Sequence, residues 1–163
     1  VFERAEEPVQ SLLEHLGPEP FDGWNASIAA KRIGKKRSAI KITLLDQRFV
    51  VGVGNIYACE ALHRSGIAPT TPSNTLVKKN GGPTKRLERL VNEVKSVLNA
   101  AIAVGGSTLN DFAAVDGTLG YFGHHFQVYG REDGPCLKDG CSGTIERIVQ
   151  SNRSTFLCPR CQK

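Results

Sequence analysis

Hydrophobic residues recur every three or four positions in three segments of the chain, and this spacing predicts helices. The first segment covers residues 5–16, and the second begins after Asn25, whose side chain can cap a helix start. The longest helix is expected from about Pro83 to Val104. Its apolar stripe consists of Leu87, Leu90, Val91, Val94, Leu98, Ala101 and Ile102. The pattern therefore predicts a mainly α-helical domain.

Two further helices, at residues 39–45 and about 55–65, flank a pair of closely spaced glycines. Gly52 and Gly54 allow the backbone to turn tightly and to approach a ligand closely. The free amides at the start of the following helix can hold an anion, and Asn55 adds a side-chain amide. This arrangement predicts a helix–two-turns–helix element with a phosphate-binding hinge, although glycine turns before helices are common in general.

Alternation of apolar and polar residues replaces the helical spacing towards the end of the chain. Residues 126–130 alternate and predict a strand. Residues 144–150 alternate again, residues 151–153 favour a turn, and residues 154–158 can run back as a second strand. The chain therefore is expected to end in a small β-hairpin.

Four cysteines bracket this hairpin as two close pairs, Cys136 with Cys141 and Cys158 with Cys161. Such spacing is typical of a structural zinc site, in which four thiolates surround the ion tetrahedrally. Two disulfides are the alternative. The Cys-x-x-Cys pair and the ribbon spacing favour one zinc ion. A site closed by four cysteines has no open position for substrate, so we expect the metal to be structural.

The charge of the chain favours a polyanionic partner. The net charge is +5 and the sequence pI is about 9.1. Arg153 lies in the predicted hairpin turn, where an arginine suits a phosphate group or a DNA groove. A solvated surface arginine is the alternative. No apolar run approaches the ~20 residues of a membrane span.

The sequence offers no convincing catalytic set. The adjacent histidines His124 and His125 point in different directions on most backbones, and Cys59 fits a small buried residue. Lys41 could form a Schiff base, but a phosphate contact or a solvated lysine fits it better. The residues alone thus predict binding rather than chemistry.

Several motifs nevertheless occur together in a specific order, and their combination resembles the C-terminal half of bacterial formamidopyrimidine-DNA glycosylases. The related endonuclease-eight glycosylases share the two-turn helix pair and the ribbon. The motifs are residues 16–20 (LGPEP), 44–47 (LLDQ), 51–60 (VGVGNIYACE), 108–112 (TLNDF) and 126–131 (FQVYGR), followed by the four-cysteine ribbon.

The resemblance implies a bifunctional base-excision repair enzyme that removes oxidised purines, such as 8-oxoguanine and formamidopyrimidines, and nicks the abasic site. Its DNA partner would be a damaged duplex with the lesion flipped out. The family nucleophile is the amine of an N-terminal proline, followed by a glutamate. Val1 and Phe2 do not match this pair. The chain also opens without methionine, so we expect a fragment that grips DNA and is inactive by itself.

The resemblance also implies roles for single residues. Asn55, Lys41 and Arg153 match phosphate-binding positions, and Gly54 and Tyr129 fall within the matching DNA-binding segments. Thr108, Asn110 and Tyr121 fall in the loop that closes over the extruded base. Asn110 stands where many relatives carry a lysine, and the first cysteine pair encloses four residues where many relatives have two. Cys136, Cys141, Cys158 and Cys161 match the zinc ligands.

These observations predict a helical domain at residues 1–125 and a zinc ribbon at residues 126–163. The helical domain would contain the helix–two-turns–helix element at about 38–66 and the lesion loop at about 105–125. We expect a monomer in the bacterial cytoplasm, associated with the nucleoid. Two alternatives stay open, a non-enzymatic zinc-ribbon module that binds nucleic acid and a zinc ribbon that binds protein.

Overall fold

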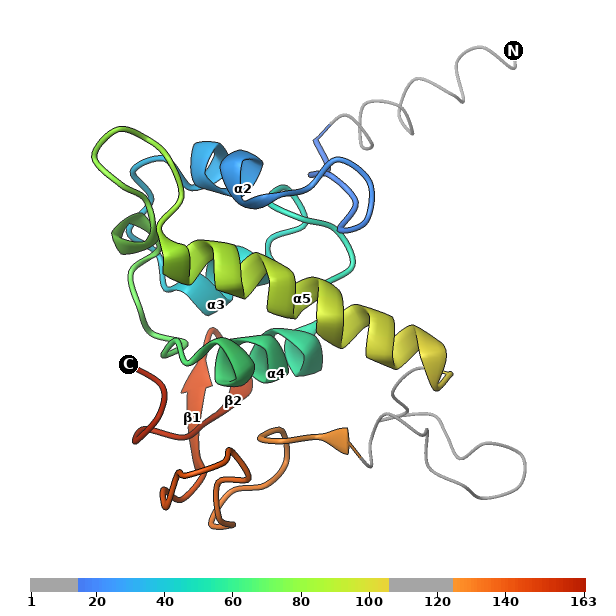
Figure 1. The fold of residues 1–163 in the computed structure, drawn as a ribbon, viewed down its shortest axis with the longest axis vertical. Helices are drawn as coiled ribbons and strands as arrows, with labels where there is room; N and C mark the ends of the chain where they lie inside the picture. Colours follow the sequence, from blue (N-terminus) through green and yellow to red (C-terminus); the bar gives the residue numbers. More distant parts are fainter. Residues whose placement is uncertain (1–14, 106–124) are drawn as a thin grey trace.

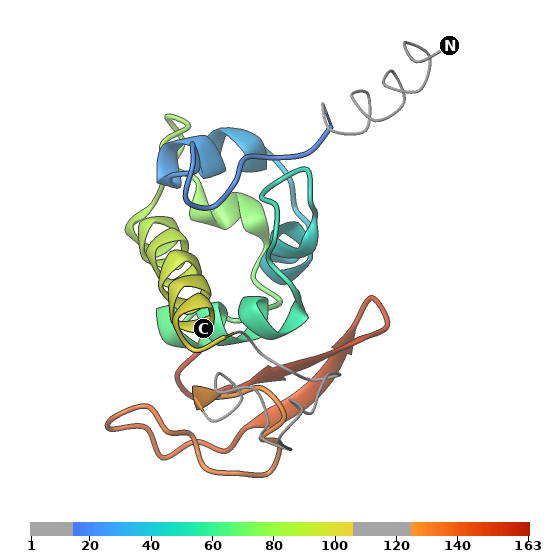
Figure 2. The same ribbon diagram turned by 90° about the vertical axis from the view of Figure 1, so that its right-hand side faces the viewer.

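The computed structural model describes residues 15–105 and 125–163. In Figure 2 the helices form one group, and the β-hairpin lies beneath them together with the segment that precedes it. A helical body followed by a small hairpin is therefore confirmed. In chain order the elements are α2 (Ala26–Ile33), α3 (Ile40–Leu45), α4 (Asn55–Ser65), the 3-10 helix η1 (Ser73–Leu76), α5 (Lys85–Ala103), β1 (Glu146–Gln150) and β2 (Arg153–Leu157).

The helix boundaries follow from side-chain caps. Asn25 accepts a hydrogen bond from the backbone N–H of Ile28, as the sequence predicted. Thr84 caps α5 in the same way, so this helix begins two residues after Pro83. The helix expected at residues 5–16 lies outside the described residues, apart from a turn at its end.

Helix α5 forms the centre of the helical body, where it packs along α4 and also contacts α2 (Figure 1). The expected stripe is buried, with one error. Ile102 is 69% exposed, whereas Val97 is fully buried. Ile102 lies in the last turn of α5, and Figure 1 shows that this end of the helix extends past α4. Within the described residues, no helix is long and apolar enough to cross a membrane.

The hairpin has a two-residue turn. Strands β1 and β2 pair antiparallel, with Gln150 opposite Arg153. Ser151 and Asn152 between them have φ values of 48° and 63°, the left-handed conformation that matches the twist of a tight hairpin. The predicted turn was therefore one residue too long, and Arg153 is the first residue of β2.

Residues 126–130 form no strand, and the prediction there was wrong. The buried side chain of Glu60 on α4 instead accepts hydrogen bonds from three consecutive backbone N–H groups. The distances are 2.6 Å from Gln127 and 2.9 Å from both Val128 and Tyr129. Burial raises the pKa of the Glu60 carboxyl above its ordinary value, and the three donors oppose that shift. The carboxylate thus replaces the partner strand that the alternation suggested.

We expect Glu60→Gln to loosen this segment. The glutamine amide has nearly the same shape as the carboxylate, but it carries no charge. Its NH2 group is a donor and cannot accept hydrogen bonds from the backbone N–H groups of this segment. Loss of such buried bonds costs about 1–3 kcal/mol. Hydrogen exchange at the amides of Gln127, Val128 and Tyr129 measures the effect. The exposed Glu132→Gln change is the control, and equal exchange in both variants would contradict the role of Glu60.

Candidate nucleic-acid interface and metal centre

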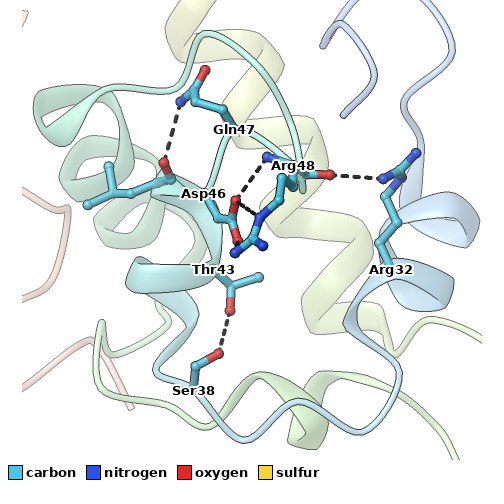
Figure 3. Close-up of polar contacts among 7 residues, drawn as sticks. Arg32, Ser38, Thr43, Asp46, Gln47 and Arg48 are labelled. Carbon is cyan, nitrogen blue, oxygen red and sulfur yellow. Dashed lines mark hydrogen bonds and ion pairs between the residues drawn. The ribbon is translucent and has the colours of Figure 1, made fainter. Parts of the chain in front are cut away.

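The segment between α3 and α4 is held by polar side chains of its own and by one from α2 (Figure 3). The Asp46 carboxylate accepts hydrogen bonds from the backbone N–H and the guanidinium of Arg48, at 2.9 and 3.0 Å. Arg32 on α2 donates to the Arg48 carbonyl oxygen at 2.8 Å. The Gln47 side chain accepts from the N–H of Gly52, whose φ of 83° suits a residue without Cβ. These bonds fix the backbone that leads into α4.

Helix α4 begins at an open surface. Gly54 is its N-cap residue, and no side chain among the described residues caps its first amides. A Cβ atom built on Gly54 would meet nothing within 4 Å. Uncapped amides and the helix dipole together favour an anion at such a position. The first turn of α4 therefore has the geometry that the hinge prediction requires.

Two side chains next to this helix start reach across to the hairpin. Asn55 Nδ2 donates to the Ser154 carbonyl oxygen at 2.9 Å. Lys41 Nζ donates to the same oxygen at 3.3 Å and also to Thr155 Oγ1. The hairpin strand β2 is thus fastened directly to the start of the helix–two-turns–helix pair.

Lys41 is fully buried, so the solvated-lysine alternative was wrong. Burial lowers the pKa of its ammonium group; Cys59 opposes this shift, and the positive charge of Arg153 adds to it. A direct phosphate contact of Lys41 stays a prediction. Its visible role is to hold β2.

Arg153 lies next to this fastening point. Its side chain is exposed, while its neighbour Ser154 carries the carbonyl that Asn55 and Lys41 bind. On the other strand, Gln150 Nε2 donates to the Pro69 carbonyl oxygen at 3.2 Å. Both strands are therefore tied to the helical body at the turn, and Arg153 projects from a fixed support.

The four cysteines form one compact cluster. Their sulfur atoms all lie within 4.8 Å of one another. The distance from Cys136 Sγ to Cys161 Sγ is 3.8 Å, and that from Cys141 Sγ to Cys158 Sγ is 3.7 Å. All four cysteines are free, and disulfide bonds are only ~2 Å long, which excludes that alternative. A tetrahedron with Zn–S bonds of about 2.3 Å has edges of about 3.8 Å, so the cluster fits one zinc ion.

The backbone at Gly143 passes close to two of the cysteine sulfur atoms. A Cβ atom on Gly143 would lie 2.5 Å from Cys158 Sγ, so only glycine allows the chain to pass there. The N–H of Gly143 donates to Cys141 Sγ at 3.4 Å. Such donors stabilise thiolates, which is the form of cysteine that binds zinc.

The other predicted site residues divide into two groups. The backbone N–H of Tyr129 binds Glu60, and its ring contacts Phe156 with a centroid distance of 4.7 Å. This placement leaves its proposed DNA contact a prediction. The candidate lesion-loop residues lie outside the described residues; they are Thr108, Asn110 and Tyr121.

Sequence reasoning missed two structural residues of α4. The sequence alone identified no partner for Glu60 or for His63. Glu60 in fact binds residues 127–129, and the Nε2 atom of His63 lies 3.3 Å from Cys136 Sγ. Asn55, Cys59 and His63 follow one another at four-residue spacing, which places them on one face of a helix. This spacing was the sequence signal that this face of α4 contacts another element.

The two parts of the chain match known families. The family described as "Formamidopyrimidine-DNA glycosylase H2TH domain" matches residues 16–113, which is more than half of the chain. The chain belongs to this family. A second family, "Zinc finger found in FPG and IleRS", matches residues 134–163. Together with the geometry of the four sulfur atoms, this match identifies the cluster as one structural zinc site.

Relatives carry the name formamidopyrimidine-DNA glycosylase. The protein from Rhodopseudomonas palustris BisA53 is 48% identical over the whole of this chain. The Lactococcus lactis Fpg in complex with DNA containing an abasic site superposes with a TM-score of 0.82 at 30% identity, covering 97% of this chain. MutM (FPG) of Thermus thermophilus superposes with a TM-score of 0.77 at 39% identity, covering 93% of this chain. The chain spans 55–56% of the length of these three proteins.

Proposed function

We propose that this chain is the DNA-binding part of a base-excision repair enzyme. The whole enzyme would remove oxidised purines, including 8-oxoguanine and formamidopyrimidines, and would cleave the resulting abasic site. Membership of the formamidopyrimidine-DNA glycosylase family supports this proposal. The abasic-site DNA bound to the L. lactis relative supports a damaged duplex as the partner.

The observation that carries the proposal is the junction at Ser154. Its carbonyl oxygen accepts hydrogen bonds from both Asn55 and Lys41, and this fixes the exposed Arg153 beside the uncapped start of α4. Two anion-binding groups of different origin, a guanidinium and a set of helix amides, therefore lie close together on a rigid support. Neighbouring phosphates of one DNA strand suit such a pair.

We further propose that these 163 residues bind DNA without forming a covalent intermediate. The resemblance assigns the nucleophile to an N-terminal proline amine, and no residue of this chain matches it. The amine of Lys41 is buried against Thr155 and Ser154, which keeps it away from a sugar carbon. The chain would act as a monomer in the cytoplasm, and analytical ultracentrifugation tests the monomer.

Binding and trapping measured side by side test the proposal. Fluorescence anisotropy compares binding of the complete chain to a duplex with a stable abasic-site analogue and to the undamaged duplex. Borohydride trapping uses the same duplex with a true abasic site. Binding without a covalent adduct is the expected result.

The other outcomes are equally informative. A borohydride adduct would show that an amine within this chain can serve as nucleophile, and the proposed division of labour would be wrong. Failure to bind either duplex would contradict the proposed DNA-binding function. Binding to single-stranded nucleic acid in preference to the duplex would favour the alternative of a non-enzymatic nucleic-acid module.

A further inference from the structure

Helix α4 turns one face towards the metal-binding segment along its whole length. Asn55, Cys59 and His63 follow at intervals of four residues and so lie on the same side of the helix. Asn55 binds β2 through the Ser154 carbonyl. Cys59 is buried in the small core that also contains Phe156. His63 completes this row near the C-terminal end of α4.

The side chain of His63 contacts a metal ligand directly. The residue is 2% exposed, and its Nε2 atom lies 3.3 Å from Cys136 Sγ. A cysteine bound to zinc is a thiolate and carries no proton. The proton of this hydrogen bond must therefore belong to Nε2, which acts as the donor.

The second cysteine pair is anchored differently. Gln162 accepts a hydrogen bond from the backbone N–H of Cys158 at 2.7 Å and donates to the carbonyl oxygen of Ile67 at 3.0 Å. The Gln162 side chain thus links the backbone of Cys158 to that of Ile67, and neither bond involves a sulfur atom. The His63 side chain, in contrast, provides a hydrogen bond between the helical body and a ligating sulfur atom.

We propose that His63 is a positioning residue of the zinc centre. Its Nε2–H group donates to the Cys136 thiolate, orients that sulfur towards the ion and links the metal to α4. Partners of this kind around zinc ligands typically change metal affinity about 10–100-fold. The proposal concerns the metal centre and does not depend on the proposed DNA-binding function.

His63→Phe tests the proposal in the complete chain, because phenylalanine keeps a planar ring and removes the donor. Competition with a chromogenic chelator is expected to show zinc bound about tenfold more weakly. In the cobalt-substituted protein, the sulfur-to-metal charge-transfer band should move to longer wavelength, because the thiolate loses a hydrogen bond that stabilises its electrons. A purely packing role of His63 would leave this band in place.

Two further variants separate the donor from the ring. His63→Gln supplies an amide donor and should recover part of the lost zinc affinity. Equal loss in the Phe and Gln variants would overturn the proposal. His125→Phe makes the same change at an exposed histidine and should leave zinc binding unaltered.

A measurement on the unaltered protein decides the matter if the Phe variant does not fold. Nitrogen-15 NMR of the zinc-loaded chain reports which ring nitrogen of His63 carries the proton. The proposal requires a protonated Nε2 with a slowly exchanging proton. A neutral ring protonated only at Nδ1 would overturn the proposal, because Nε2 would then have no proton to donate to the Cys136 sulfur.

Discussion

Removal of the zinc ion is expected to unfold the metal-binding segment while the helices stay folded. The two-stranded hairpin is too small to be stable by itself. Its core contains few side chains, and four of them belong to the zinc-binding cysteines. Zinc supplies about 10–16 kcal/mol in comparable small sites, so its loss removes most of what holds residues 134–163 together. The helical body has a separate core built by α2, α3, α4 and α5.

A single tryptophan reports on the helical body separately from the hairpin. Trp24 is the sole tryptophan, and it is buried in the helical core with its ring 6.0 Å from that of Phe49. Its fluorescence should be unchanged after chelation, while the backbone amides of β1 and β2 lose their protection from hydrogen exchange. Protected hairpin amides in the metal-free chain would contradict the structural role of zinc.

A pair of cysteine variants gives the matched control. Cys158→Ser removes a fully buried ligand and should abolish tight zinc binding. Cys59→Ser changes a cysteine that is equally buried but lies outside the cluster of four, so zinc binding should persist. Zinc loss in both variants would instead point to general destabilisation.

Local signals in the sequence predicted most of the elements correctly. The cap at Asn25 indicated a helix start, the cysteine spacing indicated the metal centre, and the apolar period indicated α5. Each of these features depends on residues close together in the chain, or on a ligand geometry that the spacing itself encodes. Such signals do not require knowledge of the tertiary arrangement.

The errors arose where a distant residue determines the local conformation. Residues 126–130 alternate like a strand, but the carboxylate of Glu60, far earlier in the chain, binds their amides. Lys41 resembles a surface cation, yet its partners Ser154 and Thr155 lie at least 113 positions away. Ile102 continues the apolar stripe, yet it is exposed in the last turn of α5. A sequence period reports which face is apolar, and it cannot report where the neighbouring element ends.

Under the proposed function, Arg153→Ala should weaken binding to duplex DNA about 10–100-fold, the range for one charge-assisted hydrogen-bonded contact. The logarithmic salt dependence of binding should flatten by ~0.9, because the counterions of one phosphate are no longer released on binding. The fold should persist, since Arg153 is exposed and pairs with Gln150 through the backbone. Anisotropy titrations at several salt concentrations measure both quantities.

Two other variants test whether position or only charge matters. Arg153→Lys keeps the charge but loses the planar fork that grips two phosphate oxygens, so its affinity should lie between those of Ala and Arg. Arg89→Ala removes the same charge from an exposed site on α5, and its salt slope should equal that of the unaltered chain. If Arg153→Ala and Arg89→Ala weaken binding equally, the general positive charge of the chain would explain the attraction. The fixed junction at Ser154 would then have no special part in holding DNA.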